Sequence, residues 1–418
     1  MDTGTTAFML CCIIGLTLMI PGLALFYGGM VSVKSSTNMM MMTFGAVAVV
    51  GLLWVLFGFS MTFGTSYGDL GLVGSLTEFA GMKNLTEPMT TINGLPISLF
   101  ALFQALFAAI TVALISGAAA DRMKFSAWMT FATLWAVLVY FPVAHWVFAF
   151  DGVVTENSVG GWIANKLKAI DFAGGTAVHI NAGAAALAVA IVLGKSKFFG
   201  TRKPHNVPLT LLGAGLLWAG WYAFNGGSAL AAGNSAAIVM VTTFTATCAA
   251  TLAWLLVERI KDGHVTGVGA ASGAVTGLVA ITPACGAVTP VGSIILGLVA
   301  GAICPFAVGL KSRFGYDDSL DVVGVHLVGG VIGTLMIGFL ASETMPNATN
   351  GLFYGGSADQ LGKQAIAAGA VMAYSFVVAY IIAFAIKKTM GIRISSEEEE
   401  AGIDAKFHRD AAYELEYA

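Results

Sequence analysis

The chain has 418 residues, of which 57% are hydrophobic and only 10% are charged, whereas a soluble domain carries about 25% charged residues. So much apolar surface cannot be hidden from water in a soluble core, so the composition excludes a soluble protein and predicts one that crosses a membrane many times. The formal net charge of −3 gives no reason to expect a nucleic-acid partner.

The predicted elements are apolar runs of roughly 20 residues bounded by polar turns, the length that an α-helix needs to cross a bilayer. The sequence therefore predicts an all-α membrane protein with eleven transmembrane helices. The first run has no basic segment before it and is longer than the apolar part of a signal peptide, so we expect it to be retained. The expected spans are 6–30, 38–63, 97–119, 125–149, 172–193, 207–225, 234–258, 266–284, 290–310, 322–341 and 364–387.

The distribution of Lys and Arg predicts the orientation, because cytoplasmic loops carry an excess of these residues. Of the 20 Lys and Arg residues, one alternate set of loops holds only Lys83, Lys166, Lys168 and Lys363, and all the others fall in the second set or in the C-terminal tail. We expect the second set to be cytoplasmic. With an odd number of spans, the N-terminus then lies outside and the C-terminus lies in the cytoplasm.

The composition changes sharply after the last span. We expect residues 1–393 to form the transmembrane domain, and residues 394–418, which include the acidic run EEEE, to form a cytoplasmic tail. Two interpretations of this tail stay open. It is either a solvated, partly disordered end or a docking segment with a regulatory role.

Short motifs recur five spans apart. LFYGG at 25–29 and AFNGG at 223–227 stand near the ends of the first and sixth spans, while the fifth and tenth spans begin with DFAGG and DVVGV and each contain a histidine. Because five is odd, a repeated five-helix unit must be inverted in the membrane, as is typical of transporters. We expect inverted halves at roughly 6–193 and 207–341, followed by the eleventh helix at 364–387.

Two histidines, His179 and His326, lie deep within expected spans. Asp171 and Asp321 stand where these spans begin, and Asp favours this position because its carboxylate accepts hydrogen bonds from free backbone N–H groups. At 1.5 Å per residue, His179 lies ~12 Å and His326 ~7.5 Å along its span. The two spans enter from opposite sides of a ~30 Å core, so the imidazoles can meet near its middle if the halves pack together.

Several interpretations of these side chains compete. A buried histidine is most often a core residue bonded to a backbone carbonyl, but an ionisable group inside a membrane is a functional candidate by default. A metal site would need further ligands, and the deep spans offer no spare carboxylate. Two neutral imidazoles, each with one donor and one acceptor, suit a small polar molecule or a proton relay. We interpret Asp171 and Asp321 as helix caps, with substrate contact as the alternative, and expect no catalytic group, metal or cofactor.

Five stretches together resemble the signatures of the ammonium transporter family (Amt, Mep and Rh proteins), and of its bacterial Amt-type members, over essentially the whole chain. They are PGLALFYGG (21–29), DFAGGTAVHINAGAAAL (171–187), FNGGSAL (224–230), TPACG (282–286) and DVVGVH (321–326). The resemblance implies a homotrimer in which each subunit has its own pore between two inverted five-helix halves, with the eleventh helix across the outside.

The resemblance also implies roles for particular side chains. Phe107 and Phe224 would form a stacked gate above the twin histidines, His179 and His326. Above the gate, the hydroxyl of Ser228 and an aromatic ring would recruit ammonium.

The aromatic ring of that recruitment site falls on Phe148, in AHWVF (144–148). Many relatives carry Trp at this position, and Phe is a weaker cation–π partner than Trp. We therefore expect weaker recruitment at Phe148, or a share of the role for Trp146 or Trp221.

The implied function is ammonium transport in the plasma membrane of a microbe, with methylammonium as an analogue and no enzymatic activity. Ammonium and potassium have similar size and equal charge, but potassium cannot lose a proton. A pore that strips the proton and conducts ammonia, with the proton following through the histidines, would reject potassium.

Two other functions stay open, and the tail bears on one of them. The first is an Rh-like electroneutral channel for ammonia or carbon dioxide, and the second is an ammonium sensor that signals through the tail. Residues 397–414 resemble the cytoplasmic end of the family, which in relatives binds a PII-type signalling protein. The expected partners are therefore ammonium, membrane lipid, two further copies of the chain and such a signalling protein.

Overall fold

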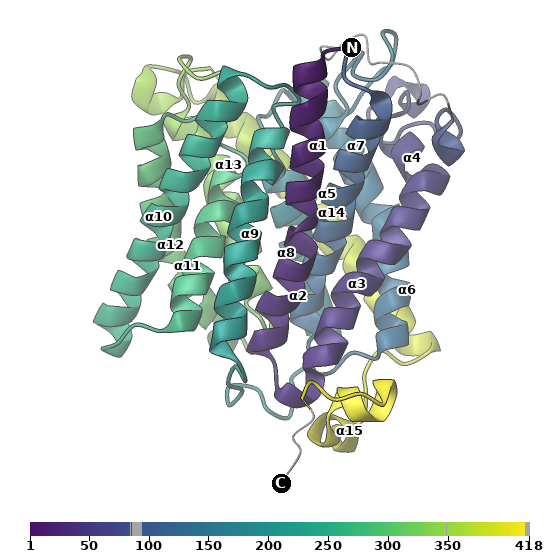
Figure 1. The fold of residues 1–418 in the computed structure, drawn as a ribbon, viewed down its shortest axis with the longest axis vertical. Coiled ribbons are helices and arrows are strands. Elements are labelled where there is room, and N and C mark those ends of the chain that lie inside the picture. Colours follow the sequence, from purple (N-terminus) through teal and green to yellow (C-terminus); the bar gives the residue numbers. More distant parts are fainter. Residues whose placement is uncertain (84, 86–93, 348, 414–418) are drawn as a thin grey trace.

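The computed structural model describes residues 1–83, 85, 94–347 and 349–413. Within this part of the chain every regular element is a helix, and the long helices stand side by side along the long axis of the molecule (Figure 1). The N-terminus lies at one end of that axis and the C-terminal tail at the other. An odd number of crossings would place the two ends of the chain in this way.

The first part of the chain forms long rods that are often built from two α-helices. A π-helical turn joins the pieces in two of them, η2 (Trp54–Gly58) and η5 (Ala136–Tyr140), and a further π-helical turn, η7 (Gly175–Ile180), begins the rod of α8. The α-helices are α1 (Thr3–Thr17), α2 (Met19–Met30), α3 (Ser36–Leu53), α4 (Phe59–Phe63), α5 (Ile97–Ala119), α6 (Phe125–Trp135), α7 (Phe141–Phe148) and α8 (Asn181–Leu193).

The second part of the chain has longer uninterrupted helices. The π-helical turn η8 (Val323–Leu327) begins the rod of α13, just as η7 begins that of α8. The α-helices are α9 (Val207–Gly227), α10 (Asn234–Asp262), α11 (Gly267–Ile281), α12 (Pro290–Phe314), α13 (Val328–Leu340), α14 (Asp359–Thr389) and, in the tail, α15 (Ser396–Ala401).

Among the described residues, 10 helical segments are long and apolar enough to cross a membrane. They correspond to ten of the expected spans, and the span expected at 97–119 has the same bounds as α5. The remaining expected span, 266–284, contains α11, an apolar helix of 15 residues. The protein is therefore a multi-pass membrane protein, and the eleventh crossing stays a prediction.

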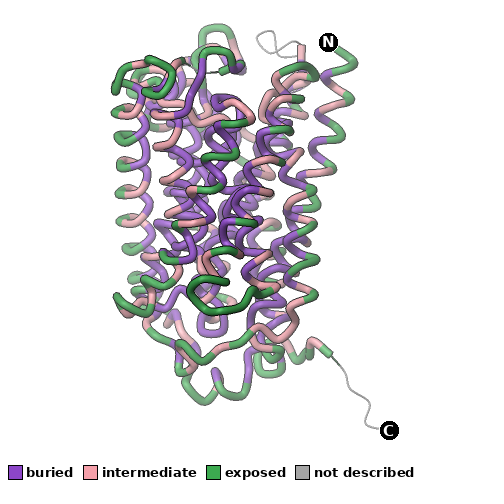
Figure 2. Tube along the Cα trace, turned by 90° about the vertical axis from the view of Figure 1, so that its left-hand side faces the viewer, coloured by how far each residue is buried: buried purple, intermediate pink, exposed green. Residues whose placement is uncertain are grey.

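The outward faces of the bundle are apolar. Figure 2 shows buried residues along the inner faces of the helices and exposed residues along their outer faces and in the loops. Leu52, Leu252 and Phe306 are exposed by 69%, 68% and 57%. Apolar exposure on this scale is costly in water but is favourable in contact with lipid or another membrane subunit.

Small residues allow the helices that carry the two histidines to approach closely, as is common in membranes. A Cβ atom on Gly183 of α8 would lie 2.5 Å from the backbone nitrogen of Leu327, which is far inside van der Waals contact. On its other side α8 packs against α14, where the Ser375 hydroxyl donates to the carbonyl of Asn181 over 2.7 Å. The close approach at Gly183 brings η8, and with it His326, against the helix that carries His179.

Candidate functional site

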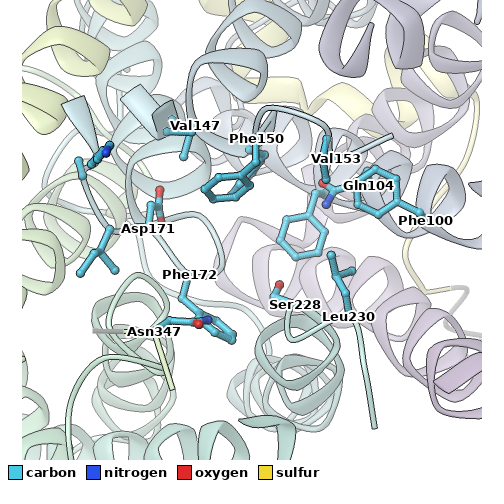
Figure 3. Close-up of a pocket in the computed structure, with 16 residues that line it drawn as sticks. Phe100, Gln104, Val147, Phe150, Val153, Asp171, Phe172, Ser228, Leu230 and Asn347 are labelled. Carbon is cyan, nitrogen blue, oxygen red and sulfur yellow. The ribbon is translucent and has the colours of Figure 1, made fainter. Parts of the chain in front are cut away.

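A cavity of about 480 Å³ opens at the end of the molecule that holds the N-terminus. Its lining comes from the beginning of α5, the end of α7 and the segment after α9, and it includes Phe107 and Phe148. Asp171 and Ser228 also belong to the lining (Figure 3). The Ser228 hydroxyl donates to the carbonyl of Phe224 over 2.9 Å. Its oxygen can therefore still accept a hydrogen bond from a ligand in the cavity.

The aromatic residues considered for recruitment lie in three different places. Phe148 lines the outer cavity and packs edge-on against Phe107, with ring centroids 6.2 Å apart. Trp146 is not part of the cavity lining, and its indole N–H donates to the carbonyl of Leu72 over 2.7 Å. Trp221 is 1% exposed and lies deeper, beside His179. Of the three, only Phe148 belongs to the lining of the outer cavity.

Two stacked phenylalanines close the floor of the outer cavity. The rings of Phe107, from α5, and Phe224, from α9, have centroids 4.0 Å apart and planes inclined by 21°. Phe107 lines the outer cavity, whereas Phe224 lines a narrow inner cavity of about 10 Å³. The stack therefore separates the two spaces, and a passing molecule would have to displace at least one ring.

The inner cavity contains both histidines. The Nδ1 atoms of His179 and His326 are 3.2 Å apart, and the two rings are nearly parallel, inclined by 27°. A contact between two Nδ1 atoms requires one to carry a proton and the other to accept it. Consequently, one ring offers a free Nε2 acceptor and the other an Nε2–H donor. The rest of the lining is apolar and includes Leu23, Ile110 and Val275.

Trp221 links the histidine pair to the gate. Its indole stacks on His179 with centroids 5.5 Å apart, and its Nε1–H donates to the Thr282 hydroxyl over 2.8 Å. Thr282 in turn reaches the Asn225 side-chain oxygen at 3.3 Å, directly next to Phe224 in the chain. Thr282 lies in the motif TPACG and Asn225 in FNGG, but these motifs alone predict no role for either side chain.

The carboxylate of Asp171 caps the helix that carries His179. It accepts hydrogen bonds from the backbone N–H groups of Gly174, Gly175 and Thr176 at 2.6–2.8 Å, and also from the Thr176 hydroxyl. These donors use the acceptor capacity of both oxygens. This geometry favours the cap over substrate contact for Asp171, even though the residue lines the outer cavity.

The prediction that Asp321 caps the second histidine helix is wrong. The carboxylate of Asp321 pairs instead with the Lys311 ammonium group, and the carboxylate of Asp318 accepts the backbone N–H of Val323 over 2.7 Å. Asp321 has a positive φ of 63°, so the chain turns at this residue and the cap falls three positions earlier. Burial raises the pKa of Asp318 to about 6, and Lys311 opposes this shift.

The described part of the tail is docked on the loops at the far end of the molecule. Glu399 accepts hydrogen bonds from the Ser196 hydroxyl and from Arg393, the latter over 2.8 Å. Asp404 accepts the backbone N–H groups of Thr37 and Asn38 at 2.9 and 2.8 Å and so caps α3 from outside. These contacts hold residues 399–404 in place, unlike a solvated, disordered end, whereas a docking or regulatory role of the tail stays a prediction. Residues 414–418 of the expected tail lie outside the described residues.

Comparisons with known proteins agree with this architecture. The family model described as the Ammonium Transporter Family matches residues 7–413. An ammonium transporter of Mycobacterium tuberculosis (strain ATCC 25618 / H37Rv) is 52% identical over 440 residues, covering 100% of this chain and 91% of the relative. An ammonium transporter of Bacillus subtilis (strain 168) is 44% identical over 417 residues, covering 99% of both chains.

Solved structures give the same result for the fold. The crystal structure of Saccharomyces cerevisiae Mep2 superposes with a TM-score of 0.86 at 32% identity, covering 95% of this chain and 88% of that one. A structure described as a sensor Amt protein superposes with a TM-score of 0.87 at 28% identity, covering 98% of both chains.

Proposed function

Because the chain belongs to the ammonium transporter family, we propose that it moves ammonium across the plasma membrane through a pore within each subunit. The observation that carries this proposal is the order of three features along one path. An open cavity lined by Phe148 and Ser228 is followed by the stack of Phe107 on Phe224, and then by two paired imidazoles.

Recruitment is assigned to the outer cavity. The free acceptor capacity of the Ser228 hydroxyl suits an N–H donor, and the ring face of Phe148 suits a cation. A cation–π contact is worth roughly 0.5–1 kcal/mol at an exposed site and more when the cation loses its water. Ammonium would therefore be concentrated above the gate with only modest affinity.

Deprotonation is assigned to the gate because the space beneath it is small and apolar. The inner cavity has a volume of about 10 Å³, so a cation would enter it without its hydration shell. The energy of bringing an unpaired charge into such an environment is many kcal/mol. Neutral ammonia avoids this cost, whereas potassium has no proton to release, so the same barrier provides selectivity.

The paired histidines would conduct both products. One free Nε2 accepts from an N–H of ammonia and the other donates to its lone pair, which compensates in part for lost hydration. When a proton enters at the free Nε2 of the first ring, the proton on its Nδ1 can pass to the Nδ1 of the second ring, which then releases its own Nε2 proton. One proton has then crossed the pair and the roles of the rings are exchanged, which is the elementary step of a proton relay. On this proposal the proton follows ammonia, and transport carries charge.

The experiment that tests the proposal is current measurement on proteoliposomes adsorbed to a solid-supported membrane, with ammonium, methylammonium and potassium compared. We expect transient currents with ammonium and methylammonium, and none with potassium. A potassium current of similar size would refute the barrier described above. Ammonia flux without current would favour the Rh-like electroneutral channel.

A second candidate function, sensing, is favoured by the docked tail. A regulatory role at this site would fit a PII-type signalling partner and an assembly of three copies. Deletion of residues 395–418 separates the functions. Retained uptake with loss of a nitrogen-dependent cellular output would support the sensor, whereas parallel loss of both would support a transporter regulated by its tail.

A further inference from the structure

Two charged residues, Lys168 and Asp171, line the outer cavity, and the other described members of its lining are uncharged. The Asp171 carboxylate is bound by the backbone N–H groups of residues 174–177 and by the Thr176 hydroxyl. These N–H groups begin the rod of α8, and the positive end of a helix offsets a negative charge beside it. The charge of Asp171 is therefore largely compensated within the protein.

The charge of Lys168 has no such compensation. Its side chain is exposed, and in the described part of the chain no residue forms an ion pair, a hydrogen bond or a cation–π contact with its ammonium group. The neighbouring Lys166 differs: its ammonium group donates to the carbonyls of Asp69 and Leu70 at 2.8 and 3.3 Å, and it is not part of the cavity lining. Of these two lysines, only Lys168 adds an unpaired positive charge to the mouth of the path.

The backbone conformation at this position favours other residue types. Lys168 follows the π-helical turn η6 (Ile163–Leu167), with φ of 59° and ψ of 40°, and its N–H donates to the carbonyl of Ile163. Gly adopts this left-handed conformation freely, and Asn and Asp adopt it more readily than Lys does. Residues held in such conformations are common at functional sites. The backbone therefore gives no reason for a lysine here, and the side chain is the part that contributes to the cavity.

We propose that Lys168 determines the charge preference of the outer cavity, lowering its occupancy by cations relative to neutral molecules. The inference rests on the proposed function, in which ammonium is recruited at Phe148 and Ser228 of the same cavity. A volume of about 480 Å³ is that of a sphere roughly 10 Å across. Over about that distance, in a medium between protein and water in dielectric constant, a unit charge changes the occupancy of a monovalent cation about 3-fold.

The charge of Lys168 acts equally on ammonium and potassium, because both are monovalent cations. It therefore weakens the binding of both without changing the selectivity between them, which the proposed function assigns to the gate. Neutral ammonia is not repelled. Salt screens exposed charges, with a Debye length of about 30 Å at 0.01 M and about 8 Å at 0.15 M, so the effect of Lys168 is largest in dilute buffer.

The first measurement detects this charge without requiring transport. Ser228→Cys places a thiol in the cavity of the full chain, held in phosphatidylcholine nanodiscs at about 10 mM salt. Two methanethiosulfonate reagents, one with a trimethylammonium group and one with a sulfonate, modify it at rates followed by mass spectrometry of the peptide containing residue 228. Adding Lys168→Asn should raise the ratio of the cationic to the anionic rate about 10-fold, because the reagents differ by two charges. Lys168→Arg keeps the charge and should leave the ratio unchanged, as should Lys83→Gln, which removes an exposed lysine outside the lining.

The second measurement is the half-saturation concentration of ammonium currents on proteoliposomes. Lys168→Asn should lower it about 3-fold at about 10 mM salt and much less at about 500 mM salt, whereas Lys168→Arg and Lys83→Gln should match the unmodified chain. An unchanged rate ratio for Lys168→Asn would overturn the inference, and so would a changed ratio with an unchanged half-saturation concentration. Absence of ammonium currents from the unmodified chain would instead refute the proposed transport, and the rate ratio would still decide whether Lys168 sets the charge preference.

Discussion

His179 and His326 meet through their Nδ1 atoms, 3.2 Å apart, although 147 positions separate them in the chain. The contact makes the two rings a unit: the protonation of one nitrogen determines that of the other. A change at either ring should therefore alter the path as a whole, and the pair is the first target for mutation.

The double variant His179→Ala, His326→Ala should lose selective uptake, because the inner path keeps its apolar wall and loses both polar contacts. We expect ¹⁴C-methylammonium uptake by proteoliposomes to fall at least 10-fold. His264→Ala, in an exposed loop, is the control and should transport normally. Full ammonium-over-potassium selectivity in the double variant would contradict the role of the pair.

Phe148→Trp should tighten recruitment, because Trp binds cations more strongly than Phe. The whole contact is worth about 0.5–1 kcal/mol at an exposed site, so a gain of about half of it corresponds to a half-saturation concentration roughly 2-fold lower. The control is Phe150→Trp, which enlarges an aromatic ring in the same cavity. If Phe148→Trp leaves the half-saturation concentration unchanged or raises it, Phe148 is not the recruiting residue.

Gly183→Ala should destabilise the protein, because the added Cβ would lie 2.5 Å from the nitrogen of Leu327. Overpacking of this kind costs about 1–3 kcal/mol, and we expect a lower unfolding temperature together with reduced transport. Gly369→Ala is the matched control: it also lies in a helix, and its Cβ would meet no atom within 4 Å. Equal unfolding temperatures for the two variants would show that the contact with Leu327 is not close in the membrane.

Glu399→Gln should release the tail, since Arg202 and Arg393 would lose the carboxylate that they share. Removal of one partner from a buried ion pair costs about 3–5 kcal/mol. We expect much faster proteolysis at the tail residues Lys406 and Arg409. Glu397→Gln changes an exposed residue of the same acidic run, and its cleavage rate should match that of the unmodified chain. Slow cleavage of both variants would mean that Glu399 does not hold the tail.

Asp318 should make stability depend on pH. Burial raises its pKa from 3.8 to about 6 in the folded protein, so its contribution is fully present below about pH 4 and is lost as the pH rises through 6. The difference between 3.8 and about 6 corresponds to roughly 3 kcal/mol. We therefore expect the unfolding temperature of the unmodified chain, relative to Asp318→Asn, to fall between pH 5 and pH 7.5. A rise over that interval would contradict the assignment.

The helix bounds were predictable because a membrane helix must be both long and apolar, and polar turns interrupt such runs clearly. The span 97–119, for example, coincides with α5. The length of the helix gave a weaker indication of a membrane crossing for α11, because its 15 residues are fewer than the ~20 that a helix perpendicular to the membrane needs to cross it.

The details of the site were harder to predict from the sequence. Asp318 and Asp321 both precede the second histidine helix, and only the left-handed backbone at Asp321 decides which carboxylate reaches the helix. Residue type alone does not distinguish an aromatic ring of the outer cavity from one deeper in the bundle, and Trp221 lies at the deeper position, beside His179. Glu399 belongs to a run of four glutamates that is typical of a solvated segment. It is buried because its carboxylate pairs with Arg202, which is far away in the sequence, and with Arg393, which precedes it by six residues.

Both histidines lie within π-helical turns, η7 and η8, and such a turn holds one residue more than the α-helical turn it replaces. Loss of one residue from either turn would let a regular α-helix form, but every side chain on one side of the deletion would rotate by about 100°. The backbone could tolerate such a deletion while the imidazole left the path. The spacing of the residues in these turns therefore matters to the pore as much as their chemical identity. A one-residue deletion in η7 or η8 should reduce transport more than most substitutions do.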